Sequence, residues 1–114
     1  MRKTGLIQEN KIIVNVNGII RFIEILDIIH IKCSGTISII QTISNNERII
    51  MTRLLKEFED ELTPKGFVRV HHSALANIKN IKSYNRKMRR ILFINDETCY
   101  ASVRKSKTIM ELLN

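Results

Sequence analysis

The chain has 114 residues, of which 44% are hydrophobic and 26% charged, and its formal net charge is +8. These values fit one globular domain and exclude a disordered chain. No apolar run approaches the roughly 20 residues of a membrane-spanning helix. The basic start at Arg2 and Lys3 lacks the apolar stretch of a secretory signal. Cys33 and Cys99 form no disulfide framework, so we expect a cytoplasmic protein whose cysteines are small core residues.

The positive charge is concentrated in the second half of the chain. Residues 1–63 carry eight Lys or Arg and eight Asp or Glu, whereas residues 64–114 carry eleven Lys or Arg and three Asp or Glu. Such one-sided charge attracts polyanions, of which nucleic acid is the first choice and acidic lipid the second. The alternative at this point is that the charge serves solubility alone.

The first part of the chain is rich in isoleucine, which favours strands because its side chain is β-branched. Residues 1–9 are expected to be a lead-in or a linker remnant, and residues 10–114 to form one domain. Asn17-Gly18 predicts a tight hairpin between two of the strands. We predict strands over residues 11–16, 19–23, 28–32, 36–42 and 47–51, with turns at Cys33-Ser34-Gly35 and Ser44-Asn45-Asn46.

The hydrophobic period then changes from that of a strand to that of a helix. The apolar residues of one helical face are Leu54, Leu55, Phe58 and Leu62, and charged residues occupy the opposite face. Thr52 is the expected N-cap of this helix. Pro64-Lys65-Gly66 is expected to end it.

The second half of the chain is again mostly extended. We predict strands over residues 67–70, 81–84, 90–94 and 98–103, while residues 73–77 fit either a single helical turn or an irregular strand. A short helix is expected from Arg104 to Leu113, with Ile109, Leu112 and Leu113 on one side. The predicted fold is therefore mainly β, with about ten short strands in antiparallel sheets, one clear helix and a short C-terminal helix.

A cluster of polar residues lies between apolar positions at residues 67–77. Alternation along a strand places Arg69 and His71 on one face and His72 on the other, so one imidazole is expected to be packed and the other exposed. We interpret His71 as a residue that holds a turn. We interpret His72 as one that offers a ring nitrogen to a base edge, and Ser73 as able to bind a phosphate.

Two groups of cations follow. Residues 86–90 place four cations on one hairpin, where a phosphate clamp and a solvated turn are equally compatible with the sequence. Arg104, Lys105 and Lys107 lie at the expected start of the last helix, where positive charge opposes the helix dipole and therefore suggests a bound anion. Arg104 has the side-chain shape that contacts guanine O6 and N7 with two hydrogen bonds.

Metal binding and enzyme activity find little support in the sequence. His30 and Cys33 are three residues apart on a predicted strand and point to opposite faces, and neither Cys-x-x-Cys nor His-Glu-x-x-His occurs. The adjacent carboxylates Asp96 and Glu97 point apart on an extended chain, and no Gly-rich phosphate loop is present. We therefore expect neither a metal, nor a cofactor, nor catalysis.

Several ordered motifs together resemble one family. The series Phe67-x-Arg69-x-His71-x-Ser73-x-x-x-Asn77-x-x-x-Ile81 is similar to the signature of the LytTR family of bacterial DNA-binding domains. Three flanking segments also resemble it: Ile28-Ile29-His30-Ile31-Lys32, Leu54-Leu55-x-x-Phe58-x-x-x-Leu62-x-Pro64 and Tyr100-Ala101-Ser102-Val103-Arg104. The resemblance spans roughly Ile12 to Leu113.

The resemblance implies an elongated, strand-rich domain that lies along double-stranded DNA and regulates transcription by inserting loops into successive major grooves at paired direct repeats. The implied base-contacting residues are Thr36, His72 and Arg104. The implied phosphate-contacting residues are Lys32, Ser34, Arg69, Ser73, Lys105 and Lys107. His71 and Asn77 would shape the loop. A second copy on an adjacent repeat and a receiver domain in the parent protein are further implied partners.

Two departures and two rival functions stay open at this point. Ala74 and Ala76 stand where the family commonly has larger residues, and no receiver domain precedes the motif, so the chain is either a stand-alone regulator or the output half of a longer one. The first rival is a small RNA-binding β-domain, which would need exposed aromatic side chains as stacking platforms. The second rival is a module that binds proteins or a membrane surface.

Overall fold

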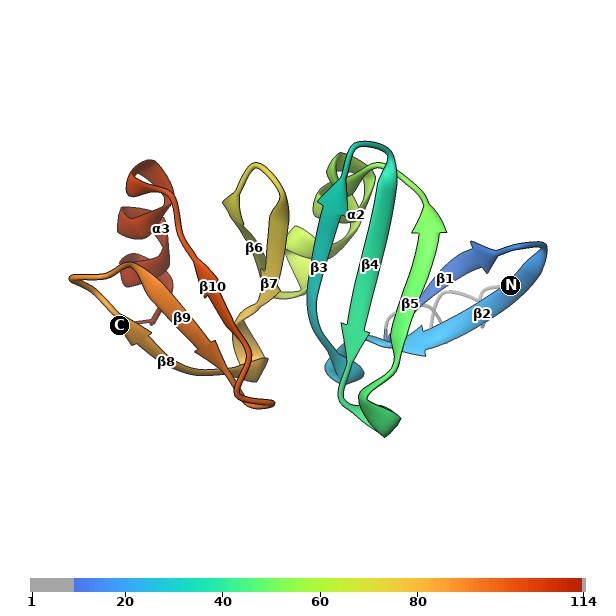
Figure 1. Cartoon of the computed structure of the whole chain (residues 1–114), viewed down its shortest axis with the longest axis horizontal. Coiled ribbons are helices and arrows are strands. Elements are labelled where there is room, and N and C mark those ends of the chain that lie inside the picture. Colours follow the sequence, from blue (N-terminus) through green and yellow to red (C-terminus); the bar gives the residue numbers. More distant parts are fainter. Residues whose placement is uncertain (1–9, 114) are drawn as a thin grey trace.

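The computed structural model describes residues 10–113, so the expected lead-in at residues 1–9 lies outside the described part, as does Asn114. The molecule is elongated, 46 × 28 × 26 Å, and mainly β, as predicted (Figure 1). Its strands are β1 (Lys11–Val16), β2 (Ile19–Glu24), β3 (Ile28–Ser34), β4 (Ile37–Thr42), β5 (Arg48–Thr52), β6 (Phe67–His71), β7 (Ala74–Asn77), β8 (Ile81–Asn85), β9 (Arg90–Phe93) and β10 (Thr98–Tyr100). Its helices are α2 (Leu55–Leu62) and α3 (Val103–Leu113), and short 3₁₀ turns are η1 (Ile25–Asp27), η2 (Ser44–Asn46), η3 (Thr63–Lys65) and η4 (Ile78–Asn80).

The strands form three antiparallel sheets. β1 and β2 make a hairpin, five strands form a central sheet in the order β5-β4-β3-β7-β6, and three form a smaller sheet in the order β10-β9-β8. The predicted hairpin turn is confirmed, because Asn17 and Gly18 both have positive φ angles, 54° and 87°. The side chain of Asn15 accepts a hydrogen bond of 2.8 Å from the Gly18 N–H.

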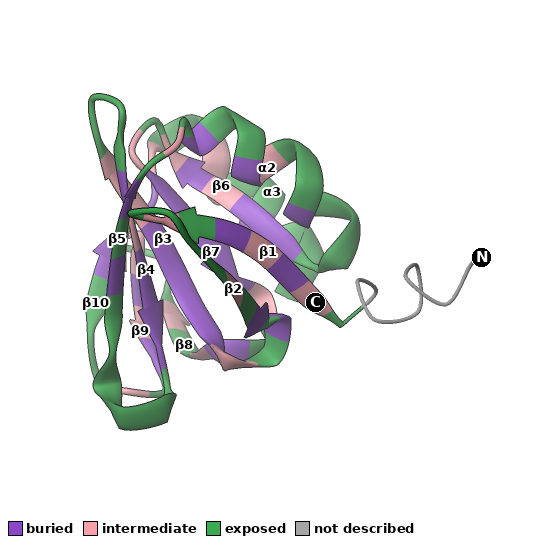
Figure 2. Cartoon of the chain, turned by 90° about the vertical axis from the view of Figure 1, so that its right-hand side faces the viewer, coloured by how far each residue is buried: buried purple, intermediate pink, exposed green. Residues whose placement is uncertain are grey.

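The central sheet is covered on both faces, and each face belongs to a different hydrophobic core. One face packs against α2 and the β1–β2 hairpin, with Ile31 and Leu75 of the sheet meeting Phe58 of α2. The opposite face, through residues such as Ala76, packs against the small sheet and Ile109 of α3. Figure 2 shows the resulting pattern of buried strands and outward-facing exposed helix surfaces. Strands β6 and β7 contribute residues to both cores. Because both strands are held by this packing, the position of the turn that connects them is fixed.

The start of α2 corrects two sequence-based expectations. Thr52 does not cap the helix, because it is the last residue of β5 and pairs with Ile37 of β4. The N-cap position belongs to Leu54, which has an extended backbone, makes no side-chain cap and is 48% exposed, so it is not on the buried face. The end of the helix is as predicted, since η3 leads into Gly66 with a φ of 97°.

The second half of the chain resolves one ambiguity, corrects one strand boundary and corrects the packed side of α3. Residues 74–77 form strand β7 rather than a helical turn. The strand predicted over residues 98–103 ends at Tyr100, because β9 offers pairing partners for only three residues of β10. On α3, Ile109 is buried as expected, but Leu112 and Leu113 are exposed, which corrects their assignment to the packed side.

A buried imidazole connects the central sheet to the small one. His30 of β3 lies 5.0 Å from the ring centre of Phe93, and its Nε2 is 2.8 Å from Glu97 Oε1 in the β9–β10 turn. Burial lowers the pKa of His30 although the hydrogen bond to Glu97 raises it. Burial by itself would raise the pKa of Glu97, but hydrogen bonds from Asn95 and His30 outweigh it and lower that pKa.

Candidate nucleic-acid interface

Three connections lie along the upper edge of the molecule in Figure 1: the β3–β4 turn (Gly35 and Thr36), the β6–β7 turn (His72 and Ser73) and the start of α3 (residues 103–107). Backbone hydrogen bonds join the segments next to these connections. The Cys33 N–H donates to the Ser73 carbonyl at 3.0 Å. The fold therefore gathers on one edge three segments that are far apart in the sequence.

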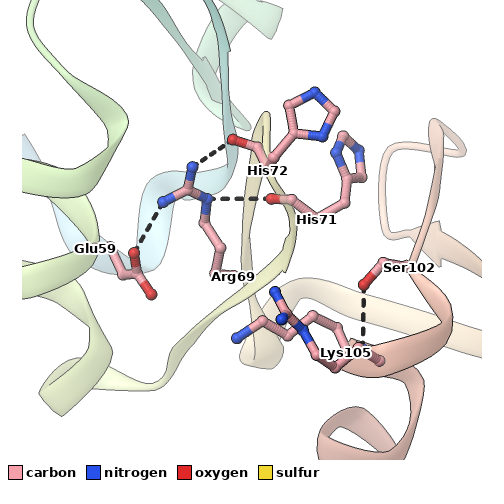
Figure 3. A pocket seen from close by; sticks show the side chains of 7 residues that line it. Glu59, Arg69, His71, His72, Ser102 and Lys105 are labelled. Carbon is pink, nitrogen blue, oxygen red and sulfur yellow. Dashed lines mark hydrogen bonds and ion pairs between the residues drawn. The ribbon is translucent and has the colours of Figure 1, made fainter.

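His72 and Arg104 line the same depression, which has a volume of about 440 Å³. Figure 3 shows this depression with His72 and Lys105 labelled. We call it the basic depression, and its lining residues are Glu59, Arg69, His71, His72, Ser102, Arg104 and Lys105. The wall contributed by β6 is joined to the wall contributed by α3 through the Ser102 N–H, which donates to the Val70 carbonyl at 2.9 Å. Two of the three predicted base-contacting residues are thus neighbours in space.

Thr36, the third predicted base-contacting residue, is outside this depression on the adjacent turn. Its side chain is exposed, and its carbonyl accepts a 3.0 Å hydrogen bond from the Arg53 N–H. Of the predicted phosphate contacts near it, Ser34 is exposed at the end of β3. Lys32 is half-buried two residues earlier on the same strand, where it pairs with Ala74.

His71 holds the β6–β7 turn from inside. Its Nδ1 accepts a 3.1 Å hydrogen bond from the Ser73 N–H and lies 3.0 Å from Ser73 Oγ, while its Nε2 lies 3.7 Å from Cys99 Sγ. An Nδ1 that accepts from a backbone N–H leaves the ring proton on Nε2. Burial lowers the pKa of His71, and the positive neighbours Lys32 and Arg69 and the ring of His72 add to the effect. The ring is therefore a neutral hydrogen-bond acceptor at neutral pH.

The two histidines differ in exposure, and their roles toward DNA stay predictions. A register shift in the β6–β7 pairing lies between Arg69 and His71 and ends the simple alternation along β6. His71 is half-buried after this shift, and His72 is exposed in the turn. Ser73, a predicted phosphate contact, is half-buried and has its hydroxyl beside His71.

Arg69 is also engaged within the chain. Its Nε donates to the His71 carbonyl at 3.1 Å, its Nη1 donates to Glu59 Oε1 at 2.9 Å, and its Nη2 donates to the His72 carbonyl. Figure 3 shows the guanidinium between Glu59 of α2 and the two carbonyls of the turn. Glu59 carries no signal of this role in the sequence, because ten residues separate it from Arg69 and only the fold brings the two side chains together.

The cations at the start of α3 have no ion-pair partner in the described part of the chain. Ser102 caps the helix, since its Oγ accepts a 3.1 Å hydrogen bond from the Lys105 N–H. None of the ion pairs among residues 10–113 includes Arg104, Lys105 or Lys107. Because a helix N-terminus already carries partial positive charge, this segment is a favourable place for an anion. Serine is a preferred N-cap, so Ser102 could have been found from the sequence had the preceding strand been ended at Tyr100.

Asn77 lies at the opposite end of β7 from the His72 turn. It is 1% exposed, and its Nδ2 donates to the carbonyls of Ile25 at 3.2 Å and Ile28 at 2.9 Å. Its neighbour Asn80 donates to the Ile28 carbonyl as well, at 2.8 Å. Asn77 therefore holds η1, at the entry to β3, and it also caps η4, because its Oδ1 accepts a 3.1 Å hydrogen bond from the Lys79 N–H.

The described residues show neither a metal cluster nor a membrane-spanning helix. Residues 10–113 contain no group of three or more His, Cys, Asp or Glu side chains placed to hold a metal ion. No helix within the same range is long and apolar enough to cross a membrane. The hairpin cations of residues 86–90 enter no ion pair within the described part of the chain, and Arg89 Nε donates to the Ala101 carbonyl at 3.3 Å.

Comparisons with known proteins agree with this geometry. The family model described as the LytTr DNA-binding domain matches residues 11–114. No curated protein sequence is similar enough to count as a match. Among solved structures, the chain is similar to the LytTr DNA-binding domain of a protein from Bacillus cereus described as a methyl-accepting/DNA response regulator. The TM-score is 0.76 at 16% sequence identity, over 92% of this chain and 97% of that one.

Proposed function

Because this chain belongs to the LytTR family of DNA-binding domains, we propose that it is a sequence-specific regulator of transcription that binds double-stranded DNA at paired direct repeats. The upper edge would face the duplex, with its three connections in successive major grooves. The single observation that supports this arrangement is that His72 and Arg104, distant in sequence, line one depression beside the Thr36 turn.

The proposed division of labour follows from the chemistry of each side chain. Arg104 would contact a guanine with two hydrogen bonds, and His72 and Thr36 would each contact a base edge. Lys105 and Lys107 on α3, together with Lys32, Ser34 and Ser73 around the two turns, would contact phosphates. Phosphate contacts supply affinity and position, whereas the base contacts supply sequence preference.

Net charge supports the same orientation. The basic half of the chain contributes α3 and the β8–β9 hairpin, and the cations at the start of α3 have no acidic partner among the described residues. If about six phosphates are neutralised, the logarithm of the binding constant should fall with the logarithm of salt concentration at a slope of about −5.

The decisive experiment is an unbiased selection of binding sites from random duplex DNA at physiological salt. We expect a recurring motif that contains guanine and occurs as two copies in the same orientation. Recovery of one copy only would reject the paired-repeat arrangement, and an unenriched pool would reject sequence-specific binding altogether.

A competition experiment separates DNA binding from the two rival functions. Three of the four phenylalanines, Phe58, Phe67 and Phe93, are buried, while the exposed Phe22 and Tyr100 lie on different sheets. Tyr84 is half-buried, and its hydroxyl is hydrogen-bonded to Ser106 of α3. The described residues therefore offer no continuous aromatic platform for single-stranded RNA. We expect duplex DNA to displace RNA at fixed salt, and binding to acidic vesicles to disappear when competitor DNA is added. Vesicle binding that survives excess DNA would favour a membrane-surface module instead.

A further inference from the structure

We propose that Arg69 is a positioning residue that, together with Glu59, holds the β6–β7 turn in the shape that presents His72 to DNA. This replaces the phosphate contact that the family resemblance implies for Arg69, and it rests on the proposed function. Arg69 and Glu59 would then influence sequence preference without touching the DNA.

The guanidinium joins three acceptors that come from two parts of the fold. Two are the consecutive backbone carbonyls of His71 and His72, and the third is the Glu59 carboxylate on α2. Three of the five N–H groups of the guanidinium are thereby used. The side chains of Arg69 and Glu59 are only 20% and 24% exposed, so the pair lies within the wall of the basic depression.

Side-chain hydrogen bonds supplement the strand pairing at this turn. The register shift between Arg69 and His71 leaves Val70 without a paired residue on β7, and pairing resumes with His71 and Ala74 next to the turn. On the other side of the turn, the His71 ring accepts from the Ser73 N–H. Arg69 satisfies the carbonyls and His71 satisfies the amide, so the turn is held from both sides while the His72 ring stays exposed.

Glu59 pairs with Arg69 at 2.9 Å and lies 4.0 Å from Lys56 on its own helix, so its closer partner is the guanidinium. A carboxylate that lines a surface for a polyanion repels the phosphates, so an isolated acidic residue there would weaken binding to every DNA. Its retention of a 2.9 Å ion pair with Arg69 gives it a different role, because the pair fixes the direction of the guanidinium fork. Helix α2 is itself anchored in the core by Phe58. Glu59 therefore holds the Arg69 guanidinium against a rigid helix.

Replacement of Glu59 shows whether its carboxylate orients Arg69 or only repels phosphates. The first role predicts weaker DNA binding in the variant, and the second predicts tighter binding. We expect Glu59→Ala to weaken binding to the selected duplex about fivefold or more, since the guanidinium loses its anchor, with a smaller change on random DNA. The matched control is Asp60→Ala, which removes the same charge from the same helix at a position that pairs only with Lys56. Asp60→Ala should leave binding unchanged or tighten it slightly. Equal tightening by both substitutions would overturn the proposal.

Replacement of Arg69 by lysine keeps the charge and removes the fork. If Arg69 only neutralised a phosphate, Arg69→Lys would keep both affinity and salt slope. We expect instead a loss of about tenfold on the selected duplex, with the salt slope and the affinity for random DNA unchanged. Full retention of the preference for the selected duplex would overturn the positioning role.

A DNA-free measurement decides the matter independently of the proposed function. Hydrogen exchange at the Ser73 amide, followed by nuclear magnetic resonance, reports whether the turn stays closed. We expect exchange at Ser73 to become faster in Glu59→Ala and Arg69→Lys, while core amides of β3 keep their protection. Unchanged Ser73 protection in both variants would overturn the proposal even if DNA binding fell. If the wild-type chain shows no sequence preference, the proposed function fails. Hydrogen exchange at Ser73 then still tests whether Arg69 and Glu59 hold the turn closed.

Discussion

The β6–β7 turn and the start of α3 form facing parts of one depression, yet they are built in opposite ways. In the turn, Arg69 and His71 direct their polar atoms inward, to two carbonyls and an amide of the same segment. At the start of α3, Arg104 and Lys107 are exposed and form no ion pair within the described chain. One region uses its charged and polar groups to fix a shape, and the other keeps its charge available.

This difference shows how one small surface can combine specificity with attraction. A turn with fixed backbone positions its exposed side chain at little entropic cost on binding. Unpartnered cations gain their partners only when phosphates arrive, so they contribute affinity and salt dependence. Substitutions in the two regions should therefore differ in kind. Replacing the inward-directed Arg69 or His71 should lower stability and sequence preference, whereas replacing cations of α3 should lower affinity without changing stability.

The largest effect is expected from His71→Ala. The substitution removes the acceptor of the Ser73 N–H and leaves space beside Cys99, so the free energy of unfolding should fall by about 2–3 kcal/mol. Urea unfolding measures this directly. The neighbouring substitution His72→Ala serves as the control and should leave stability within about 0.5 kcal/mol, because His72 is exposed. Equal stability losses in the two variants would contradict the conclusion that His71 holds the turn and His72 does not.

The second-largest effect is expected from Arg104→Ala, which tests whether the exposed arginine at the start of α3 contacts a base. We expect a loss of about 1–3 kcal/mol in binding free energy on the selected duplex, a smaller loss on random DNA, and unchanged unfolding. Titrations with both duplexes at one salt concentration provide the measurement. Losses of the same size on both would reduce Arg104 to a phosphate contact.

A smaller and uniform effect is expected from Lys107→Ala. Affinity for every DNA sequence should decrease slightly, and the magnitude of the salt slope should fall by about 1. Lys79→Ala is the matched control, because Lys79 is an exposed lysine in η4, beyond the end of β7 that is opposite the His72 turn. A loss confined to the selected duplex would show that Lys107 contacts a base, and an identical change in Lys79→Ala would show that only total charge matters.

The smallest effect is a dependence of stability on pH. Burial lowers the pKa of both His30 and His71 from the ordinary value of 6.5. The unfolded chain then binds protons at pH values where these folded histidines do not, so the free energy of unfolding should decrease as the pH falls below about 6.5. Unfolding at about pH 7.5 and about pH 5.5 should show the decrease, and His71→Asn should make it smaller. A protein that becomes more stable on acidification would contradict this assignment.

The sequence determined the local structure wherever neighbours in the chain decide it. Asn17-Gly18 predicted the first hairpin and Gly66 the end of α2, because each needs a backbone conformation set by adjacent residues. The abundance of β-branched isoleucine in the first part of the chain predicted β3, β4 and β5 of the central sheet. The charge excess of the second half, and the motif from Phe67 to Ile81, indicated a DNA-binding domain before any geometry was considered.

Only the tertiary structure decided which residues share a site. Long-range strand pairing, rather than helix propensity, turned residues 74–77 into β7 and kept Thr52 in β5. The same packing placed Glu59 against Arg69 and redirected that guanidinium toward the turn. Such contacts join segments through two cores and carry no local periodicity, so spacing along the chain cannot predict them. The physical reason is that a strand or helix fixes the direction of its own side chains, whereas packing between elements fixes what those side chains meet.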